Sequence, residues 1–190
     1  MAAGDSKISI CNIALIALGE GTITSLADNT KRAILCNARY DQVRRAVLES
    51  HPWNCAKRRA QLPAAAQAPV FGFQAAFPVP ADFLRLVEIV GFEHPKWEIE
   101  DGQILCDYSA PLAIRYIYDL QDETRLMPTL VDCIGYALAA ELAVPLCQSL
   151  SKQQDMLKQL AGKLDNAKLV NAQQNSSPEL EDDVLLESRR

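Results

Sequence analysis

Histidine, metal-binding cysteine pairs and long apolar runs are scarce or missing in this sequence of 190 residues. The histidines are His51 and His94, and the six cysteines form no C-x-x-C pair. Metal sites in proteins need several His or Cys ligands that arrive together, so we expect neither a metal nor another cofactor. Free Cys behaves as a small hydrophobe, and we therefore expect mostly buried, unpaired thiols.

The common catalytic motifs are also missing. The sequence has no G-x-x-x-x-G-K-[ST], G-x-G-x-x-G, G-x-S-x-G or H-E-x-x-H pattern, which would indicate phosphate, dinucleotide, hydrolase or zinc chemistry. Each histidine precedes a proline, His51 at a predicted helix end and His94 in a predicted turn. At such positions a role in the turn is a better interpretation than a role as a catalytic base. We expect that the chain is not an enzyme.

No apolar run reaches the roughly 18 residues that suggest a membrane span. The longest mixed stretch, Gly135 to Leu150, is interrupted by Glu141 and Pro145. The first residues, MAAGDSKISICN, show no basic segment leading into an apolar one, which is the pattern of a secretion signal. We expect no membrane association, and we expect the chain to assemble in the cytoplasm.

The net charge of −5 is unevenly distributed. Residues 31–59 hold eight bases and two acids, hence +6, whereas residues 82–123 hold three bases and ten acids, hence −7. Such a separation favours a molecule that meets copies of itself, or partners of opposite charge, at defined faces. A free nucleic-acid binder would normally be basic overall.

Two helices are predicted within residues 1–60. In both, apolar residues recur at steps of three and four, the spacing of one helix face. Short polar residues cap a helix start, glycine ends a helix, and the residue before proline is pushed out of the helical region. The predicted start and stop residues are Ser6 and Gly19 for the first helix, and Asp28 or Asn29 and His51-Pro52 for the second.

Residues 61–125 are predicted to form a β-rich insertion. Nine of the twelve aromatic residues lie between positions 71 and 118, and prolines mark an irregular entry. Alternating polarity around Asp101-Gly102 predicts a hairpin. The predicted strands, which would form one small antiparallel sheet, are 83–90, 96–100, 103–107 and 112–118.

Two further helices are predicted in residues 126–172, with a stop or kink at Pro145. Residues 173–190 are polar and acidic, which predicts a flexible arm that orders on a partner. Its predicted anchors on that partner are Leu180, Val184, Leu185 and Leu186. The predicted fold class is α+β: a four-helix bundle with an inserted small antiparallel β-sheet and a flexible C-terminal arm.

The basic stretch around residues 44–59 is the candidate partner interface. It could contact DNA phosphates or an acidic face of a neighbouring subunit, and the alternative is a solvated, salt-bridged helix surface. For the tryptophan of this stretch, Trp53, the first interpretation is a packing anchor and the second is an interface residue. The candidate residues are Arg44, Arg45, Trp53, Lys57, Arg58 and Arg59.

The chain resembles the head-to-tail adaptors of short-tailed bacteriophages, a family also called tail tubular protein A. The most specific agreement is His51-Pro-Trp-Asn-x-Ala56 combined with Phe71-Gly-Phe73 and Phe77-Pro-x-Pro-x-Asp-Phe-Leu-Arg85. Leu18-Gly-Glu20, the D-x-T-x-x-A-x-x-C-x-x-x-YD pattern from Asp28, and Leu112-x-Ile-Arg-Tyr-Ile117 extend it over most of residues 10–170. Cys55 stands where the family pattern has Phe, and the acidic arm has no counterpart.

This resemblance implies a structural virion protein of the phage neck and tail. Its copies form a ring, of twelve in the family, between the portal and the tail nozzle or tail fibres. The ring lines the DNA exit channel, and DNA passes it without sequence specificity. The helices then pack side by side, the β insertion meets the tail, and the arm reaches the portal. The alternative from the residues themselves is a cytoplasmic DNA-binding or regulatory helical protein that uses residues 44–59.

Overall fold

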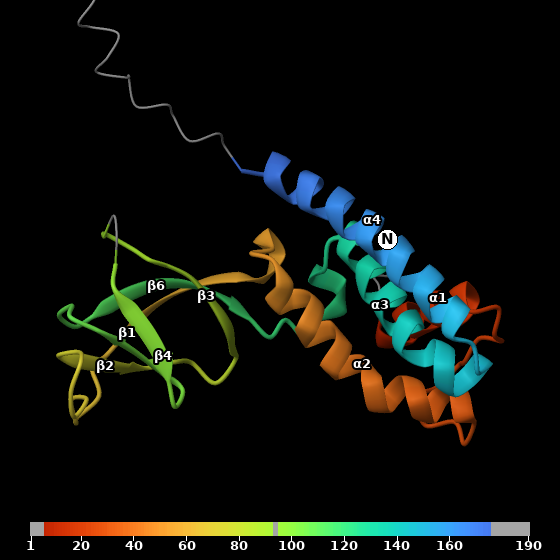
Figure 1. The fold of residues 1–190 in the computed structure, drawn as a ribbon, viewed down its shortest axis with the longest axis horizontal. Coiled ribbons are helices and arrows are strands. Elements are labelled where there is room, and N and C mark those ends of the chain that lie inside the picture. Colours follow the sequence, from red (N-terminus) through yellow and green to blue (C-terminus); the bar gives the residue numbers. More distant parts are fainter. Residues whose placement is uncertain (1–5, 93–94, 176–190) are drawn as a thin grey trace, which may run out of the picture.

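The computed structural model describes residues 6–92 and 95–175 and has a helical part and a β part (Figure 1). Its elements, in chain order, are α1 Lys7–Ala17, α2 Lys31–Ser50, η1 Asn54–Ala56, β1 Lys57–Leu62, β2 Ala75–Pro78, β3 Phe83–Ile89, β4 Trp97–Glu100, β5 Gln103–Cys106, β6 Leu112–Tyr118, η2 Glu123–Arg125, α3 Pro128–Cys147 and α4 Leu150–Gln173.

The predicted starts of the first two helices are partly confirmed. Ser6 caps α1, and its hydroxyl accepts a hydrogen bond from the backbone N–H of Ser9. The cap of α2 is Thr30, whose hydroxyl accepts from Ala33, and not Asp28 or Asn29. Asp28 is occupied elsewhere, because its carboxylate accepts from the backbone N–H of Ser25. A side chain that closes the preceding turn cannot also cap the helix.

Helix α3 is the centre of the helical part, and the expected four-helix bundle is wrong. Contacts join α3 to α1, α2 and α4, whereas α4 makes few contacts with the other two helices. The reason is composition: α3 buries side chains on most of its circumference, while α4 buries Met156, Ala167 and Asn171. The result is a central helix with three neighbours, and not a closed bundle of four.

Two features of α3 depend on this central position. At Gly135 an added Cβ would lie 2.6 Å from Cγ2 of Ile13, so glycine is what lets α1 approach closely. By length and composition α3 passes as a membrane span among the described helices, and 56% of that stretch is buried within the fold. Pro145 does not end the helix, which continues to Cys147 and closes with Gln148 at φ 51°.

The β part contains two three-stranded antiparallel sheets, and not the single small sheet that was expected. Their strand orders are β1-β6-β3 and β2-β5-β4. The predicted hairpin is confirmed as β4–β5, with positive φ at both Asp101 and Gly102 as a tight hairpin turn requires. Strands β1 and β2 were not predicted, and β1 begins at Lys57, before residue 61. Both are edge strands, which need little apolar alternation. The basic residues of β1 and the prolines beside β2 therefore gave no strand pattern in the sequence.

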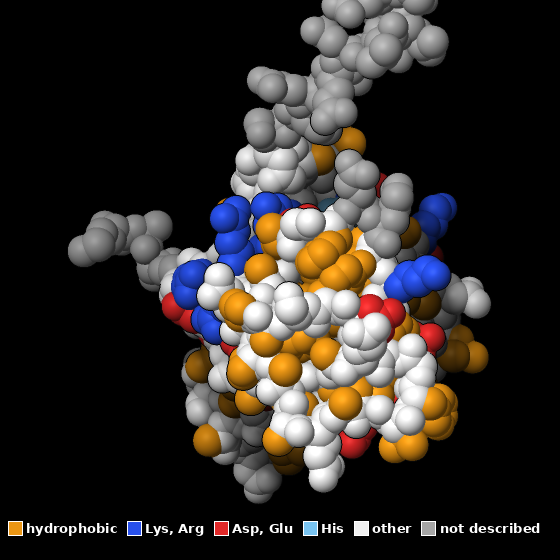
Figure 2. All heavy atoms as spheres, turned by 90° about the vertical axis from the view of Figure 1, so that its left-hand side faces the viewer, with side chains coloured by type: hydrophobic (Ala, Val, Ile, Leu, Met, Phe, Trp, Pro, Cys, Tyr) orange, Lys and Arg blue, Asp and Glu red, His pale blue; other side chains and the backbone are white. Residues whose placement is uncertain are grey.

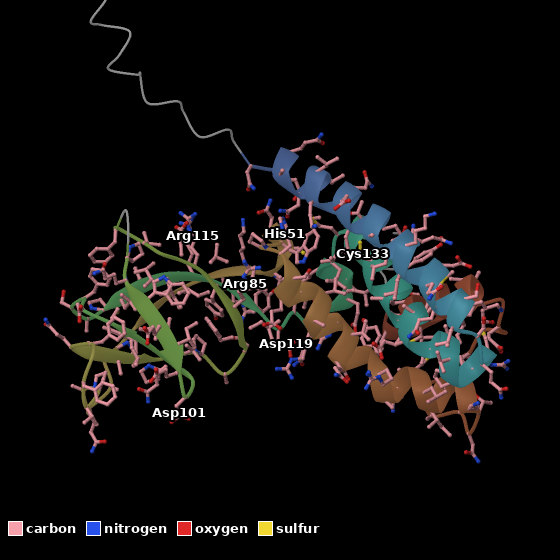
Figure 3. The ribbon with its side chains drawn as sticks, in the orientation of Figure 1. His51, Arg85, Asp101, Arg115, Asp119 and Cys133 are labelled. Carbon is pink, nitrogen blue, oxygen red and sulfur yellow. The ribbon has the colours of Figure 1, made fainter. Side chains whose placement is uncertain are left out.

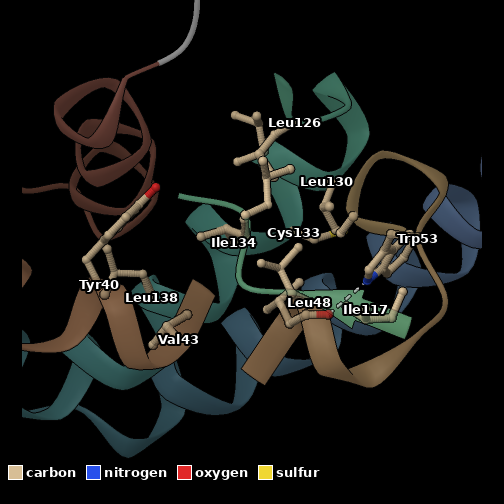
Figure 4. Packing of buried hydrophobic residues seen from close by; sticks show 14 of the residues in the cluster. Tyr40, Val43, Leu48, Trp53, Ile117, Leu126, Leu130, Cys133, Ile134 and Leu138 are labelled. Atoms are coloured by element: carbon tan, nitrogen blue, oxygen red, sulfur yellow. Dashed lines mark hydrogen bonds between the residues drawn. The ribbon is translucent and has the colours of Figure 1, made fainter. Parts of the chain in front are cut away.

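One continuous apolar core joins the helices to both sheets. Trp53 is completely buried where α2 leads into β1, and it packs with Leu48 and Ile117 (Figure 4). Its indole N–H donates to the carbonyl oxygen of Val47 at 2.9 Å. These contacts fix the sheet β1-β6-β3 to the end of α2.

Candidate interaction surfaces

Arg44 lies inside the molecule, where the helices meet the sheets. It is 3% exposed, its guanidinium donates to the carbonyl oxygen of Leu120, and it forms an ion pair with Asp119 at 2.9 Å. These contacts tie α2 to the segment after β6. The prediction that Arg44 faces a partner is therefore wrong, because its own chain encloses the guanidinium.

Trp53 is likewise closed to any partner. Its side chain is fully buried, and its one polar hydrogen is used within the chain. Of its two interpretations, the packing anchor is confirmed and the interface role is wrong. The basic stretch thus loses two of its six candidate residues to the core.

The oppositely charged segments 31–59 and 82–123 meet within one chain. Arg58 forms an ion pair with Asp82 and lies over the ring of Tyr118, at 3.7 Å from the ring centroid. Asp82 also accepts a hydrogen bond from the hydroxyl of Tyr116 at 3.1 Å. Together with the pair of Arg44 and Asp119, this contact uses charges that the sequence had suggested for contacts between neighbouring subunits.

Arg45 stays on the surface of α2. Its side chain is 58% exposed, and its Nε lies 3.9 Å from the carboxylate of Asp119. An exposed pair at that distance contributes little to stability. Arg45 is therefore available to a partner, but it lies on a helix and not beside the two remaining candidates.

Lys57 and Arg59 belong to a larger basic surface on one face of the sheet β1-β6-β3. Directly paired residues of antiparallel strands share a face, and residues two apart on a strand share it too. The register aligns two neighbouring rows of this face: Lys57, Ile117 and Arg85 form one, and Arg59, Arg115 and Glu88 form the next. We call the four cations Lys57, Arg59, Arg85 and Arg115 the basic sheet face.

The centre of the basic sheet face carries a repulsive contact. Arg59 and Arg115 are direct cross-strand partners, and like charges in that position destabilise a sheet. Arg115 is balanced by Glu88 at 3.1 Å, whereas Arg59 is exposed and forms no ion pair with any carboxylate of residues 6–92 and 95–175. Arg59 and Arg115 line a shallow hollow of about 270 Å³ together with residues that include Gln61, Val90 and Ala113. An acidic partner would relieve this repulsion.

The positive charge continues from the basic sheet face to the end of α4. His51 has its pKa lowered by burial and by the nearby cations Lys168, Lys57 and Arg85. Arg85 donates to the backbone carbonyl oxygens of Glu49 and Ser50, which completes the C-terminus of α2. Figure 3 shows Arg115, Arg85 and His51 on the side of the molecule where α4 ends, with Asp101 on the opposite side.

Exposed apolar side chains mark the free end of the β part. Val70 is 97% exposed and Phe71 is 87% exposed, and we call this pair the apolar tip. The loop that carries it borders a groove of about 630 Å³ whose other side includes Leu105 and Glu100. Figure 2 shows hydrophobic side chains gathered across this end, with Lys and Arg mainly toward its upper border.

A second group of exposed apolar side chains lies at the opposite end of the molecule. Ile16 near the end of α1, Ile34 in the first turn of α2 and Leu150 at the start of α4 are 64%, 53% and 68% exposed. These helix ends gather at the right of Figure 1, far from the sheets. We call these three residues the helical end.

The described cysteines are free, as predicted, and most are chemically quiet. Cys11, Cys36, Cys106 and Cys133 are buried, and Cys55 and Cys147 are partly buried. Burial raises the pKa of Cys133 to about 11, so its thiol stays protonated at neutral pH. Within residues 6–92 and 95–175 no three His, Cys, Asp or Glu side chains come together as metal ligands.

Sequence reasoning found two of the four residues of the basic sheet face, Lys57 and Arg59, and missed the other two. Arg85 and Arg115 were counted in the acidic segment, although strand alternation alone would have placed Arg115 on one face with Ala113. Which strand pairs with β6 is a long-range choice, and it alone brings these cations beside Lys57 and Arg59.

The predicted arm anchors Leu180, Val184, Leu185 and Leu186 lie outside the described residues, as does His94. No family model matches the chain, and no curated protein is found to be similar to it.

Proposed function

We propose that the chain is a structural adaptor of the phage neck, which forms a ring between the portal and the tail nozzle and lines the DNA exit channel. It has no catalytic role in this proposal. The observation that carries it is the pair of exposed apolar surfaces at opposite ends of an elongated molecule. A subunit held between neighbours needs contact surfaces on separate sides.

The apolar tip supports a contact at one end. Side chains as exposed as those of Val70 and Phe71 gain free energy when a partner removes them from water, by about 25 cal/mol per Å² of apolar area. The tip lies on the β part, which the proposal assigns to the tail nozzle or tail fibres. The rigid hairpin β4–β5 and the groove beside it would fix the orientation of that contact.

The helical end supports a contact between copies. Ile16, Ile34 and Leu150 come from three different helices that α3 holds together, so they form a preorganised surface. On α4 this surface continues along the helix to Leu157, which is 50% exposed. In the proposed ring these helices lie side by side, and the portal supplies the template.

The alternative, a DNA-binding or regulatory helical protein, finds less support. It depends on residues 44–59 as one basic surface, but Arg44 is buried and Arg58 is paired with Asp82. Arg45 lies on α2, separate from Lys57 and Arg59 on β1. The remaining cations do not form a helix surface that could follow a DNA groove.

The test combines the purified chain with portal protein and measures the mass of the assembly by native mass spectrometry. We expect a ring on the portal and, after addition of tail nozzle protein, a larger complex. The double variant Val70→Ser/Phe71→Ser should keep the ring and lose the nozzle, whereas Ile16→Ser/Leu150→Ser should weaken the ring itself. Lys158→Ser, at an exposed position of α4, is the matched control and should change neither.

A chain that ignores the portal would contradict the proposal if it also bound duplex DNA with a steep salt dependence. That result would favour the alternative. A monomer before portal is added agrees with the proposal, because the template is then absent.

A further inference from the structure

We propose that residues 176–190 bind the basic sheet face of their own chain. This segment, SSPELEDDVLLESRR, holds five acids and two arginines and therefore carries a charge of −3. The face holds four cations and one acid in two adjacent rows of the sheet. The proposal concerns the isolated chain and does not depend on the proposed function.

The chain leaves α4 beside this face. Asn171, in the last turn of α4, is 3% exposed and accepts a hydrogen bond from the backbone N–H of Asn54 at 2.7 Å. The side chain of Asn54 also donates to the backbone carbonyl oxygen of Asn171 at 2.9 Å. Asn54 begins η1, which leads directly into β1. The end of α4 is thus fixed next to the first residue of the basic sheet face.

The segment is long enough to cover the face. An extended chain spans at most about 3.3–3.6 Å per residue, so the 15 residues after Asn175 reach up to roughly 50 Å. The first acid, Glu179, is four residues beyond Asn175, which corresponds to about 14 Å. Lys57 follows Asn54 by one turn of η1, and Arg59 is two strand residues further. The acids at 179–187 can therefore reach both rows.

The face offers what an acidic and apolar segment needs. Arg59 has no ion pair with a described carboxylate, and its repulsion with Arg115 is relieved when a carboxylate lies between them. The hollow next to them is lined in part by Val90, Ala113 and Ile114, and it can take an aliphatic side chain. The segment supplies both, since the acids at 179–183 are followed by Val184, Leu185 and Leu186.

The tether favours this occupant over a free anionic partner. A ligand joined through a short linker has an effective concentration of the order of millimolar at its site. Nucleic acid would have to approach a chain whose net charge is −5 and would compete with that tethered segment. In the assembled neck, a portal that binds the same arm would have to displace it from the face.

The test is a charge exchange in the full-length chain, read by NMR. In the variant Glu181→Lys/Asp182→Lys/Asp183→Lys we expect the amide signals of Lys57–Gln61 and Ala113–Ile117 to shift. The variant Arg59→Glu/Arg115→Glu should in turn shift the signals of residues 179–187. Combining both sets should restore contact between the two regions. The matched control reverses three acids of the hairpin β4–β5, Glu98, Glu100 and Asp101, and should leave all of these signals unchanged.

Salt gives a second readout on the unaltered protein. At about 1 M salt the screening length falls to about 3 Å, so the wild-type signals should move toward those of the lysine variant. The proposal is overturned if neither charge reversal moves signals on the other region. It is also overturned if the shifts grow with protein concentration, because the segment then binds a second copy. Failure of ring assembly with portal would not produce either result, so the two proposals are tested separately.

Discussion

Replacement of Asp119 by alanine is expected to destabilise the fold strongly, although Asp119 is a carboxylate near the surface. Its side chain is 16% exposed, and it is the ion-pair partner of Arg44, whose side chain is 4% exposed. Removal of Asp119 leaves a guanidinium enclosed by protein with the carbonyl oxygen of Leu120 as its hydrogen-bond acceptor. The carboxylate of Asp41 remains 3.8 Å from the same guanidinium nitrogen that pairs with Asp119.

The expected magnitude follows from the burial of the remaining charge. Removal of one partner of a buried pair costs about 3–5 kcal/mol, because the other charge stays desolvated without compensation. Asp119 is partly exposed, so water can enter the space that it leaves. We therefore expect about 3 kcal/mol for Asp119→Ala.

Asp41→Ala is the matched control. Asp41 lies near the same guanidinium, but its side chain is 61% exposed. Exposed pairs contribute about 0.2–1 kcal/mol, so we expect a loss at the lower end of that range. Urea unfolding followed by circular dichroism gives the free energy of unfolding of both variants. If the two losses agree within about 1 kcal/mol, the assignment of a buried charge to Arg44 is refuted.

Two further predictions concern packing and pH. Gly135→Ala should cost about 1–3 kcal/mol by overpacking against Ile13, whereas Gly162→Ala, with open space around it, should be neutral or stabilising; urea unfolding compares them. The pKa of His51 should lie below its usual value of about 6.5 in an NMR titration, and Lys168→Gln should raise it, since burial and that cation disfavour the imidazolium. The pKa of His51 is lower in the folded than in the unfolded state. The contribution of neutral His51 to the stability of the fold is therefore complete above about pH 6.5 and is lost as the pH falls through the folded-state pKa. An unchanged pKa in Lys168→Gln would contradict this account.

The elements with strong local signals were predicted correctly. Apolar spacing indicated all four helices, His51-Pro52 ended α2 as expected, and Asp101-Gly102 formed the hairpin turn. Each of these depends on neighbouring residues, whose backbone preferences act at short range. Strand β1 has no such signal, because Lys57, Arg58 and Arg59 interrupt its apolar alternation.

The charge pattern shows where local reasoning stops. Segments 31–59 and 82–123 differ in charge as the sequence indicates, but their net charges do not say which atoms meet. Arg44 and Arg45 are neighbours in sequence, yet one is buried and the other is exposed, because successive residues of a helix point in different directions. Arg58 and Arg59 separate for the related reason that strand residues alternate between faces.

The sequence by itself determined the helices, the hairpin, the free thiols and the presence of a basic stretch, since all of these follow from residue type and short-range spacing. Only the tertiary structure decided that α3 is central, that the strands form two sheets, and which cations share a surface. The pairing of β6 with both β1 and β3 joins residues far apart in the chain. That choice depends on the free energy of the whole core, in which Trp53, Leu48 and Ile117 must pack together, and no local pattern contains it.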